Sequence, residues 1–300
     1  MVIVIVGPTA SGKTALSLAL AERLGGEVVN ADSVQLYRGL NIGSAKASAE
    51  ELARVPHHLI DVLEVDEEAS VAAFQRDARA AIAEIAGRGK VPLLVGGSSL
   101  YVRAVIDDLD FPGTDPAVRA RWTAALEARG PAALHAELAD RDPAAAAQIL
   151  PTNGRRIVRA LEVVELTGEP FVATMPPYDS VLGDVSMIGL DVARDVLDER
   201  LAARVRQMWD AGLVDEVRRM LPAGLAEGRT ASRALGYQQV LAMLAGEMTE
   251  DEAIEATITG HRRFARRQDR MFRKDPRVTW VPHDAPDLVD RALASAGPRR

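Results

Sequence analysis

The sequence contains no cysteine and few aromatic residues. Among its 300 residues are three tryptophans, four tyrosines, five phenylalanines and no cysteine. Without cysteine, the chain forms no disulfide bond, has no thiol nucleophile and offers no cysteine-ligated zinc site. Because this composition suits a reducing compartment, we expect a cytoplasmic protein.

Long hydrophobic runs and an excess of positive charge are also missing. No apolar run approaches the roughly 20 residues of a membrane span, so we expect no membrane partner. The apolar start, Met1 to Val6, lacks a basic flank and a cleavage site, which predicts a strand rather than a signal peptide. The net charge of −7 argues against a nucleic-acid partner unless basic residues are concentrated locally.

A glycine-rich motif follows the apolar start. The pattern G-x-x-x-x-G-K-[ST] lies between a predicted buried strand, Val2 to Val6, and a predicted helix from Thr14 to Leu24. In this setting the N–H groups of the loop and of the helix N-terminus bind phosphate. The lysine would neutralise a terminal phosphate, and the last hydroxyl would ligate Mg²⁺. The predicted phosphate-binding residues are Gly7, Pro8, Thr9, Ala10, Ser11, Gly12, Lys13 and Thr14.

Strand and helix signals alternate over the first hundred residues. This alternation predicts an α/β protein whose parallel sheet is flanked by helices, in a P-loop NTPase-like arrangement. The length and the 48% hydrophobic content are sufficient for about two domains. Besides the first strand, strands are expected at residues 27–31, 91–95, 185–190 and 278–281.

The composition changes after residue 109. Residues 112–177 are rich in alanine and arginine, with helical patterning and no convincing strand. We therefore predict that residues 1–111 and 178–300 form the P-loop α/β core, and that residues 112–177 form a small all-helical domain inserted into it.

The glycine-rich loop alone does not decide which reaction the bound phosphate takes part in. The predicted strand at 91–95 ends in Gly96-Gly97-Ser98-Ser99, without the carboxylate that P-loop ATPases use to hold Mg²⁺. This disfavours an ATPase or GTPase but leaves a small-molecule kinase as an alternative. Asp32, at the carboxyl end of the second predicted strand, would then accept a substrate hydroxyl proton.

Further motifs narrow the choice. Residues 32–46, DSVQLYRGLNIGSAK, resemble the second signature of the tRNA dimethylallyltransferase family, also called tRNA isopentenyltransferases. Other segments similar to the family's motifs are PHHLID at 56–61, GGSSLY at 96–101, RIVRALEV at 156–163, GYQ at 236–238 and RRQ at 266–268. The motifs run in the family's order from Gly7 to about Arg273, so the chain is identified as a member of this family.

The resemblance implies prenyl transfer instead of phosphoryl transfer. Members move the dimethylallyl group of dimethylallyl diphosphate to N6 of an adenosine next to the anticodon of tRNA and release diphosphate. The P-loop would hold this leaving group, with Mg²⁺ as cofactor bound through Thr14. Asp32 would be the general base for N6, and Ser98 stands where many members carry threonine. The expected catalytic residues are Asp32, Ser98, Lys13 and Arg119.

The residues that contact RNA are predicted from the charge pattern and from the family's motifs. Residues 262–274 contain seven Lys or Arg against one acid, with Arg262, Arg266 and Arg270 spaced four apart on one helix face. Gln35 has an amide suited to the N6/N7 edge of adenine. The expected partner is the tRNA anticodon loop, and we expect a monomer. The predicted tRNA contacts are Asp32, Ser33, Val34, Gln35, Ser98, Arg119, Arg155, Arg156, Arg159, Arg233, Gly236, Tyr237, Gln238, Arg266, Arg267, Gln268 and Arg273.

Three alternatives to this interpretation differ in class. A small-molecule kinase would consume ATP and would need no basic helix. An adenylate isopentenyltransferase would prenylate free nucleotides, and the arginine-rich helix and the insertion argue against it. A non-enzymatic RNA-binding module would need none of the reactive side chains of Lys13, Thr14 and Asp32, all of which are intact.

Overall fold

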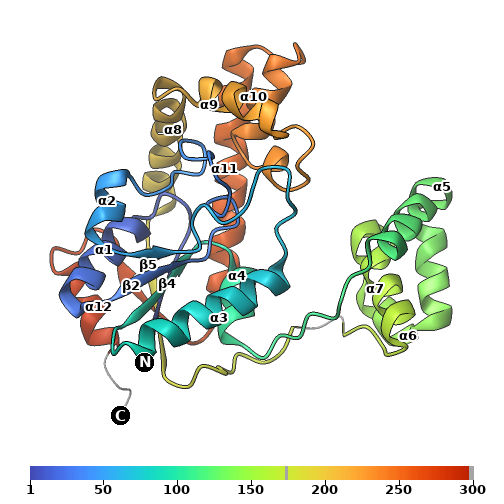
Figure 1. Cartoon of the computed structure of the whole chain (residues 1–300), viewed down its shortest axis with the longest axis horizontal. Coiled ribbons are helices and arrows are strands. Elements are labelled where there is room, and N and C mark those ends of the chain that lie inside the picture. The colour runs from blue at the N-terminus through green and yellow to red at the C-terminus, as the bar shows by residue number, and fades with distance from the viewer. Residues whose placement is uncertain (173–174, 297–300) are drawn as a thin grey trace. The chain divides into compact units, whose positions relative to one another are not determined.

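The computed structural model describes residues 1–172 and 175–296 of the chain. The chain folds as two compact units, residues 1–107 with 178–300 and residues 108–177, which Figure 1 shows. The sequence predicts the first boundary after residue 111, four residues later than in the structure. It predicts the second boundary after residue 177, as in the structure.

The larger unit contains a sheet of six parallel strands in the order β3-β2-β4-β1-β5-β6. It is the α/β fold that the alternating sequence signals predict. Strand β1 lies inside the sheet, where Ile5 is paired with Val95 of β4 and with Ile188 of β5. The strands are β1 (Val2–Val6), β2 (Glu27–Asn30), β3 (His57–His58), β4 (Pro92–Gly96), β5 (Val185–Asp191) and β6 (Val278–Pro282).

Helices cover both faces of this sheet. Side chains along β1 alternate between the two faces because a strand has a period of two residues. Ile3 and Ile5 pack toward α1 and α12, and Val4 and Val6 pack toward α3 and α4. Burying each such side chain contributes about 1.5–3 kcal/mol, which makes the P-loop strand rigid. The helices are α1 (Lys13–Leu24), α2 (Ala49–Arg54), α3 (Val71–Gly87), α4 (Ser99–Ile106) and α12 (Leu288–Ala296).

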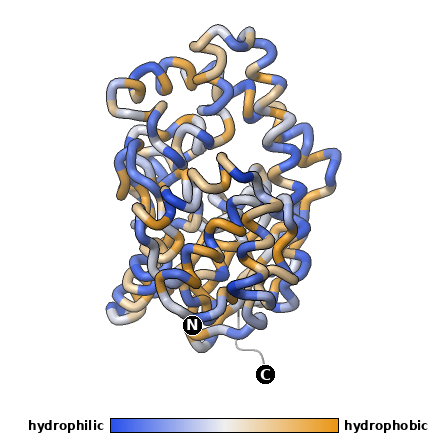
Figure 2. Tube along the Cα trace, turned by 90° about the vertical axis from the view of Figure 1, so that its right-hand side faces the viewer, coloured by the Kyte–Doolittle hydropathy of each residue, from blue (hydrophilic) through white to orange (hydrophobic). Residues whose placement is uncertain are grey.

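A second hydrophobic core lies among the helices between β5 and β6. Val205, Met208 and Tyr237 belong to it, together with Tyr37 and Leu40 from the loop after β2. Helix α8 packs along α11, and hydrophobic and hydrophilic residues alternate along the helices in Figure 2. The elements are α8 (Arg194–Asp210), α9 (Leu213–Met220), the 3₁₀ turns η1 (Leu221–Ala223) and η2 (Ala231–Arg233), α10 (Tyr237–Leu244) and α11 (Glu250–Phe272).

The regular elements of the smaller unit, within its described residues, are all helices. They are α5 (Pro116–Arg141), α6 (Pro143–Gln148) and α7 (Gly154–Thr167). Helix α5 is kinked at Gly130, whose φ of +78° is followed by Pro131, a residue that cannot continue the hydrogen-bond ladder. Trp122, Leu138 and Leu161 are among the residues of its core. In the described part of both units, no helix combines the length and the apolar character that a membrane span needs.

Candidate active site

The P-loop after β1 has a backbone that favours glycine. Gly7 and Gly12 have φ of +144° and +100°, values that side chains rarely allow, and Ala10 is held at +65°. Such strained residues gather at ligand sites. Helix α1 begins at Lys13 without a side-chain cap, so the N–H groups of its first turn have no intrahelical partner. The loop therefore presents a set of N–H donors suited to an anion.

Lys13 lies folded back over this loop. Its Nζ donates to the carbonyl oxygens of Gly7 at 3.0 Å and Pro8 at 2.8 Å. Burial and the positive charge of Arg204, against the opposing effect of Asp32, lower the pKa of Lys13 to about 8. The buried ammonium thus has no close carboxylate among the described residues, and an anion bound to the loop would stabilise its charge.

A cavity of about 550 Å³ opens in front of the P-loop, a size typical of small-molecule sites. Two arginines of α8, Arg200 and Arg204, extend into it from outside the loop. No described residue pairs with either guanidinium. The cavity is therefore lined by a cluster of positive charge, which the carboxylate of Asp32 offsets only in part. Its lining includes Thr9, Lys13, Thr14, Asp32, Arg200, Arg204 and Gln268.

Asp32 follows β2 at the carboxyl edge of the sheet. Its Oδ1 accepts the Val34 N–H at 2.9 Å, and its backbone N–H donates to Asn30 Oδ1 at 3.0 Å. Asn30 is buried, and its Nδ2 donates to the carbonyl oxygens of Asp32 and Leu59. Asn30 therefore fixes the backbone at Asp32, and the second carboxylate oxygen has no partner among the described residues.

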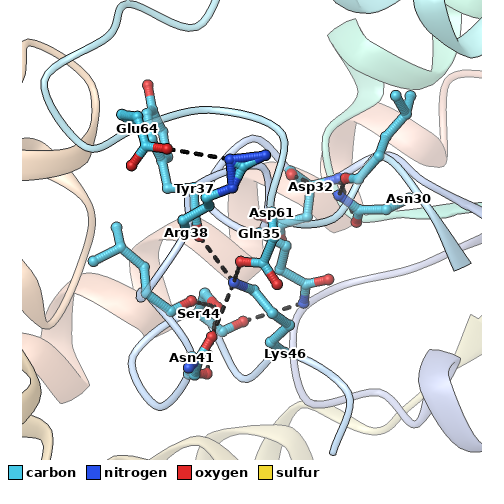
Figure 3. A network of polar contacts seen from close by, with 12 residues as sticks. Asn30, Asp32, Gln35, Tyr37, Arg38, Asn41, Ser44, Lys46, Asp61 and Glu64 are labelled. Atoms are coloured by element: carbon cyan, nitrogen blue, oxygen red, sulfur yellow. Dashed lines mark hydrogen bonds and ion pairs between the residues drawn. The ribbon is translucent and has the colours of Figure 1, made fainter. Parts of the chain in front are cut away.

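The loop that follows Asp32 is anchored by a buried lysine, which lies at the centre of Figure 3. Lys46 Nζ donates to Tyr37 O at 2.8 Å, to Asn41 Oδ1 at 3.0 Å and to Asp61 Oδ1 at 2.6 Å. Its side chain is only 3% exposed. All three donors are used, so Lys46 holds the shape of the loop and has no donor left for a ligand.

Gln35 contributes to the same loop (Figure 3). Its Nε2 donates to the carbonyl oxygens of Ser44 at 3.2 Å and Ala45 at 3.3 Å. The predicted use of this amide on adenine requires both a donor and an acceptor. Because the donors are already used within the loop, only the Oε1 atom is available to a substrate in this conformation.

A second cavity of about 490 Å³ adjoins the first. Thr9, Asp32, Ser44, Arg204 and Gln268 line both, so the two cavities meet at Asp32. The second cavity is also lined by residues that the sequence assigns to catalysis or to RNA: Ser33, Val34, Ser98, Arg233 and Arg267. Ser98 caps α4 there through a long 3.5 Å contact from the Tyr101 N–H.

His261 lines the second cavity as well. Neither ring nitrogen has a hydrogen-bond partner among the described residues. Burial, reinforced by the positive charge of Arg204, lowers the pKa of His261 to about 4. The imidazole is therefore neutral at pH 7, with one donor and one acceptor nitrogen.

The arginines of α11 divide into two groups. Arg266, with Asp198 at 3.5 Å, and Arg262, which donates to the Asp198 carbonyl oxygen, face α8. Arg273 pairs with Asp191 and lies over the Trp280 ring. Three others, Arg263, Arg267 and Arg270, have no carboxylate partner in the part of the chain that the structure describes. Arg263 and Arg267 line the second cavity, and Arg262, Arg266 and Arg270 are not among its lining residues.

The GYQ segment differs from its prediction. Tyr237 is fully buried, and its hydroxyl donates to Glu216 Oε1 at 2.7 Å. Gly236 is buried as well, so neither residue is exposed in this structure, and their contact with tRNA stays a prediction. Burial and the nearby Glu216 raise the pKa of Tyr237, which keeps the hydroxyl protonated as a donor. Gln238 is exposed.

Four predicted contacts lie in the smaller unit. Arg119 and Arg159 donate to the buried carboxylate of Glu162, at 2.6 Å and 2.9 Å. Burial raises the pKa of Glu162, but hydrogen bonds from Arg119, Thr114 and Arg159 outweigh it, and the pKa lies below its usual value. Arg155 and Arg156 are exposed on α7. Arg119 therefore has a structural partner, and its catalytic role stays a prediction.

A side-chain hydroxyl beside the P-loop suits magnesium. Among residues 1–172 and 175–296, no group of three acidic or histidine side chains could hold a metal. Thr14 is exposed at the start of α1 and lines the first cavity, as Asp32 does. Because Mg²⁺ is often bound by few protein oxygens together with substrate phosphates, this donor set fits the ion.

Sequence reasoning missed several of these residues. Arg200 and Arg204 lie inside a helix, where charged side chains usually face solvent, and no motif distinguishes them. Asn30 did have a signal, because it is a polar residue at the carboxyl end of a buried strand.

Comparisons with known proteins agree on one family. A family model described as IPP transferase matches residues 35–275 of the chain. A tRNA dimethylallyltransferase from Thermobifida fusca is 62% identical over 298 residues, covering 98% of this chain and 93% of that protein. One from Streptomyces coelicolor is 62% identical over 289 residues, covering 96% and 92%.

Solved structures show the same likeness. The crystal structure of a full-length tRNA isopentenylpyrophosphate transferase from Bacillus halodurans matches with a TM-score of 0.71 and 42% identity, covering 98% of this chain and 94% of that one. Crystallographic snapshots of a eukaryotic dimethylallyltransferase acting on tRNA match with a TM-score of 0.77 and 25% identity, covering 98% and 76%.

Proposed function

The chain belongs to the IPP transferase family, and from this membership we propose that it is a tRNA dimethylallyltransferase. It transfers the dimethylallyl group of dimethylallyl diphosphate to N6 of an adenosine next to the anticodon and releases diphosphate. The relatives of known name support the reaction class, and the arrangement of the two cavities supports the assignment of roles to residues.

The observation that carries the proposal is the meeting of the two cavities at Asp32. The first cavity contains the P-loop and the cationic groups of Lys13 and Arg204, which suit a diphosphate. The second contains Arg263 and Arg267, whose exposed guanidinium groups suit an RNA backbone. A carboxylate where they join lies between donor and acceptor substrates.

The proposed chemistry is a displacement at the allylic carbon. The bond between this carbon and the diphosphate oxygen breaks, and its electron pair stays on the diphosphate. The N6 lone pair forms the new carbon–nitrogen bond, and the N6 proton passes to the Asp32 carboxylate. Lys13, Arg204 and the N–H groups of the loop stabilise the negative charge that develops on the leaving group.

The proposal also assigns roles to Mg²⁺ and to the residues that would bind the RNA. Mg²⁺, when bound near Thr14, would neutralise part of the diphosphate charge. The target base must leave its stack to reach Asp32, which costs least in a loop. Arg233, Arg263 and Arg267 would hold the backbone beside it. We propose that the chain acts on tRNA as a monomer in the cytoplasm; light scattering checks the monomer.

The test is an acceptor comparison. The purified chain is incubated with Mg²⁺, radiolabelled dimethylallyl diphosphate and unmodified tRNA, with AMP or ATP as parallel acceptors. We expect RNase-sensitive label in tRNA and release of diphosphate. Label in the free nucleotide would instead assign the chain to nucleotide prenylation. ATP consumption with small alcohols, and no prenyl transfer, would favour the kinase.

The role of Asp32 is tested by Asp32→Asn. This change removes the base and keeps the size of the side chain, so kcat should fall by about 10²–10⁴-fold. The affinity for tRNA should stay within threefold, by our estimate, because phosphate contacts dominate it. Asp66→Asn, at an exposed carboxylate away from both cavities, is the matched control. Normal turnover by the Asp32 variant would refute the general-base assignment.

A further inference from the structure

Ile60 follows β3 and faces a cavity instead of a hydrophobic core. Its neighbour Leu59 packs against the core that the sheet shares with α3 and α4. Ile60 belongs to none of the hydrophobic clusters of the described residues, and it lines the first cavity. The proposed reaction gives this half-buried side chain no role. It is therefore available to a ligand in the cavity.

The backbone on both sides of Ile60 is held in an unusual shape. Leu59 and Asp61 have φ of +61° and +55°, values that side chains rarely adopt. Asn30 Nδ2 donates to the Leu59 carbonyl oxygen at 2.9 Å. Lys46 Nζ donates to Asp61 Oδ1 at 2.6 Å (Figure 3). Such strain persists at ligand sites when the surroundings fix it. Because isoleucine is also branched at Cβ, this side chain has little freedom to move aside.

The order of the strands places Ile60 opposite the P-loop. The six strands are parallel, so the segments after β1, β4, β2 and β3 follow one another along the carboxyl edge. These segments contribute the P-loop, Gly97, Asp32 and Ile60 to the first cavity. Neighbouring strands lie about 4.8 Å apart, which puts β3 about 14 Å from β1 and one spacing from β2. The cavity thus runs from the P-loop past Asp32 to Ile60.

The donor in the proposed reaction has its parts in the same order. With the diphosphate at the P-loop and the C1 atom beside Asp32, the allylic chain extends toward β3. From C1, a dimethylallyl chain spans three carbon–carbon bonds of about 1.5 Å each, which fits one strand spacing. A geranyl chain is one isoprene unit longer and spans seven such bonds. It would therefore collide with Ile60.

We propose that Ile60 is a specificity-determining residue, which closes the end of the cavity and limits the donor to a five-carbon allylic chain. A longer chain has to displace a side chain that its neighbours hold in place. One methylene too many in an apolar site costs about 10–200-fold in specificity. The inference rests on the proposed function, because it takes dimethylallyl diphosphate as the donor.

The experiment compares two donors. The full chain is incubated with Mg²⁺, unmodified tRNA and either dimethylallyl diphosphate or geranyl diphosphate, and kcat/KM is measured for each donor. Mass spectrometry of the adenosine product distinguishes a five-carbon from a ten-carbon substituent. Ile60→Val and Ile60→Ala shorten the side chain in two steps. Val62→Ala, at an exposed position in the same segment and outside the lining of the cavity, is the matched control.

We expect the unchanged chain and the control to prefer dimethylallyl diphosphate by at least about 100-fold. Ile60→Ala should move the ratio of kcat/KM toward geranyl diphosphate by about 10–60-fold, because each of the three carbons removed makes room for a methylene worth about fourfold. Ile60→Val, which loses one methyl group, should move it by about fourfold. An unchanged ratio in Ile60→Val would overturn the proposal even if Ile60→Ala misfolds.

Two further outcomes separate this inference from the proposed function. Equal use of both donors by the unchanged chain would overturn the role of Ile60 alone. The longer chain would then pass Ala45 and Ala47 into an adjoining cavity of about 600 Å³, which these two residues also line. Absence of prenyl transfer from either donor would overturn the proposed function and this inference with it.

Discussion

The affinity of the P-loop for dimethylallyl diphosphate should fall as the pH rises above 8. Burial, with help from Arg204 and against Asp32, lowers the pKa of Lys13 from 10.5 to about 8. About 90% of the lysine is then protonated at pH 7 and about 10% at pH 9. If the charged form binds the diphosphate, the Kd should rise about tenfold between these pH values. The loss should level off at about 10–150-fold, the value of a hydrogen bond to a charged group.

The same pKa predicts proton uptake on binding. The diphosphate stabilises the ammonium form, so the complex keeps the proton that the free protein has lost. Uptake should be about 0.1 proton at pH 7, about 0.5 at pH 8 and about 0.9 at pH 9. Calorimetry in two buffers of different ionisation enthalpy measures this number directly, without tRNA, so that no prenyl transfer occurs.

Two variants test whether Lys13 is the responsible group. Lys13→Met should bind weakly at every pH and take up no proton. Arg204→Gln removes a positive neighbour, so the midpoint should move to higher pH even though the affinity falls. A constant Kd and no proton uptake from pH 7 to 9 would refute the reasoning, as would an unchanged pH dependence in Lys13→Met.

Three other predictions follow from single observations. Arg267→Ala should weaken tRNA binding and reduce the salt slope of log K by about 1; an unchanged slope in filter binding would contradict a phosphate contact. Glu162→Ala removes the carboxylate that Arg119 and Arg159 share. It should lower the free energy of unfolding, measured by urea titration, by about 3–5 kcal/mol, and a loss below 1 kcal/mol would contradict a buried ion pair. The His261 ring protons should titrate near pH 4 by NMR, and higher in Arg204→Gln; titration near 6.5 would contradict the burial argument.

The sheet could be predicted because its strands are short buried runs. The strands at β1, β2, β4, β5 and β6 each lie within one residue of the expected bounds. Strand β3 was missed since it consists of only two residues, both histidine, and has no hydrophobic signal. Its pairing with β2 comes from the tertiary structure and not from its own sequence.

The site could be predicted where the chemistry is local in sequence. The P-loop and Asp32 follow strands directly, so the strand ends determine where they lie. Arg204 and Gln268 belong to helices more than 150 residues further on, and their side chains reach the site only through the packing of α8 and α11. Sequence pattern places a residue on a helix, but the helix's rotation and neighbours decide what the residue contacts.

The motif residues that turned out to be buried show why a resemblance locates a site more reliably than it assigns roles. Glu216 accepts the N–H groups of Asn41, Ile42 and Gly43, and Tyr237 donates its hydroxyl to the same carboxylate. Lys46 holds the other side of this loop. A loop without regular structure has many unpaired backbone groups, and each must find a partner when buried. The buried carboxylate and ammonium supply those partners, which keeps the segment from Asp32 onward in one shape. Such residues act on the substrates through the loop, so a motif marks both the groups that touch the ligand and the groups that hold them in place.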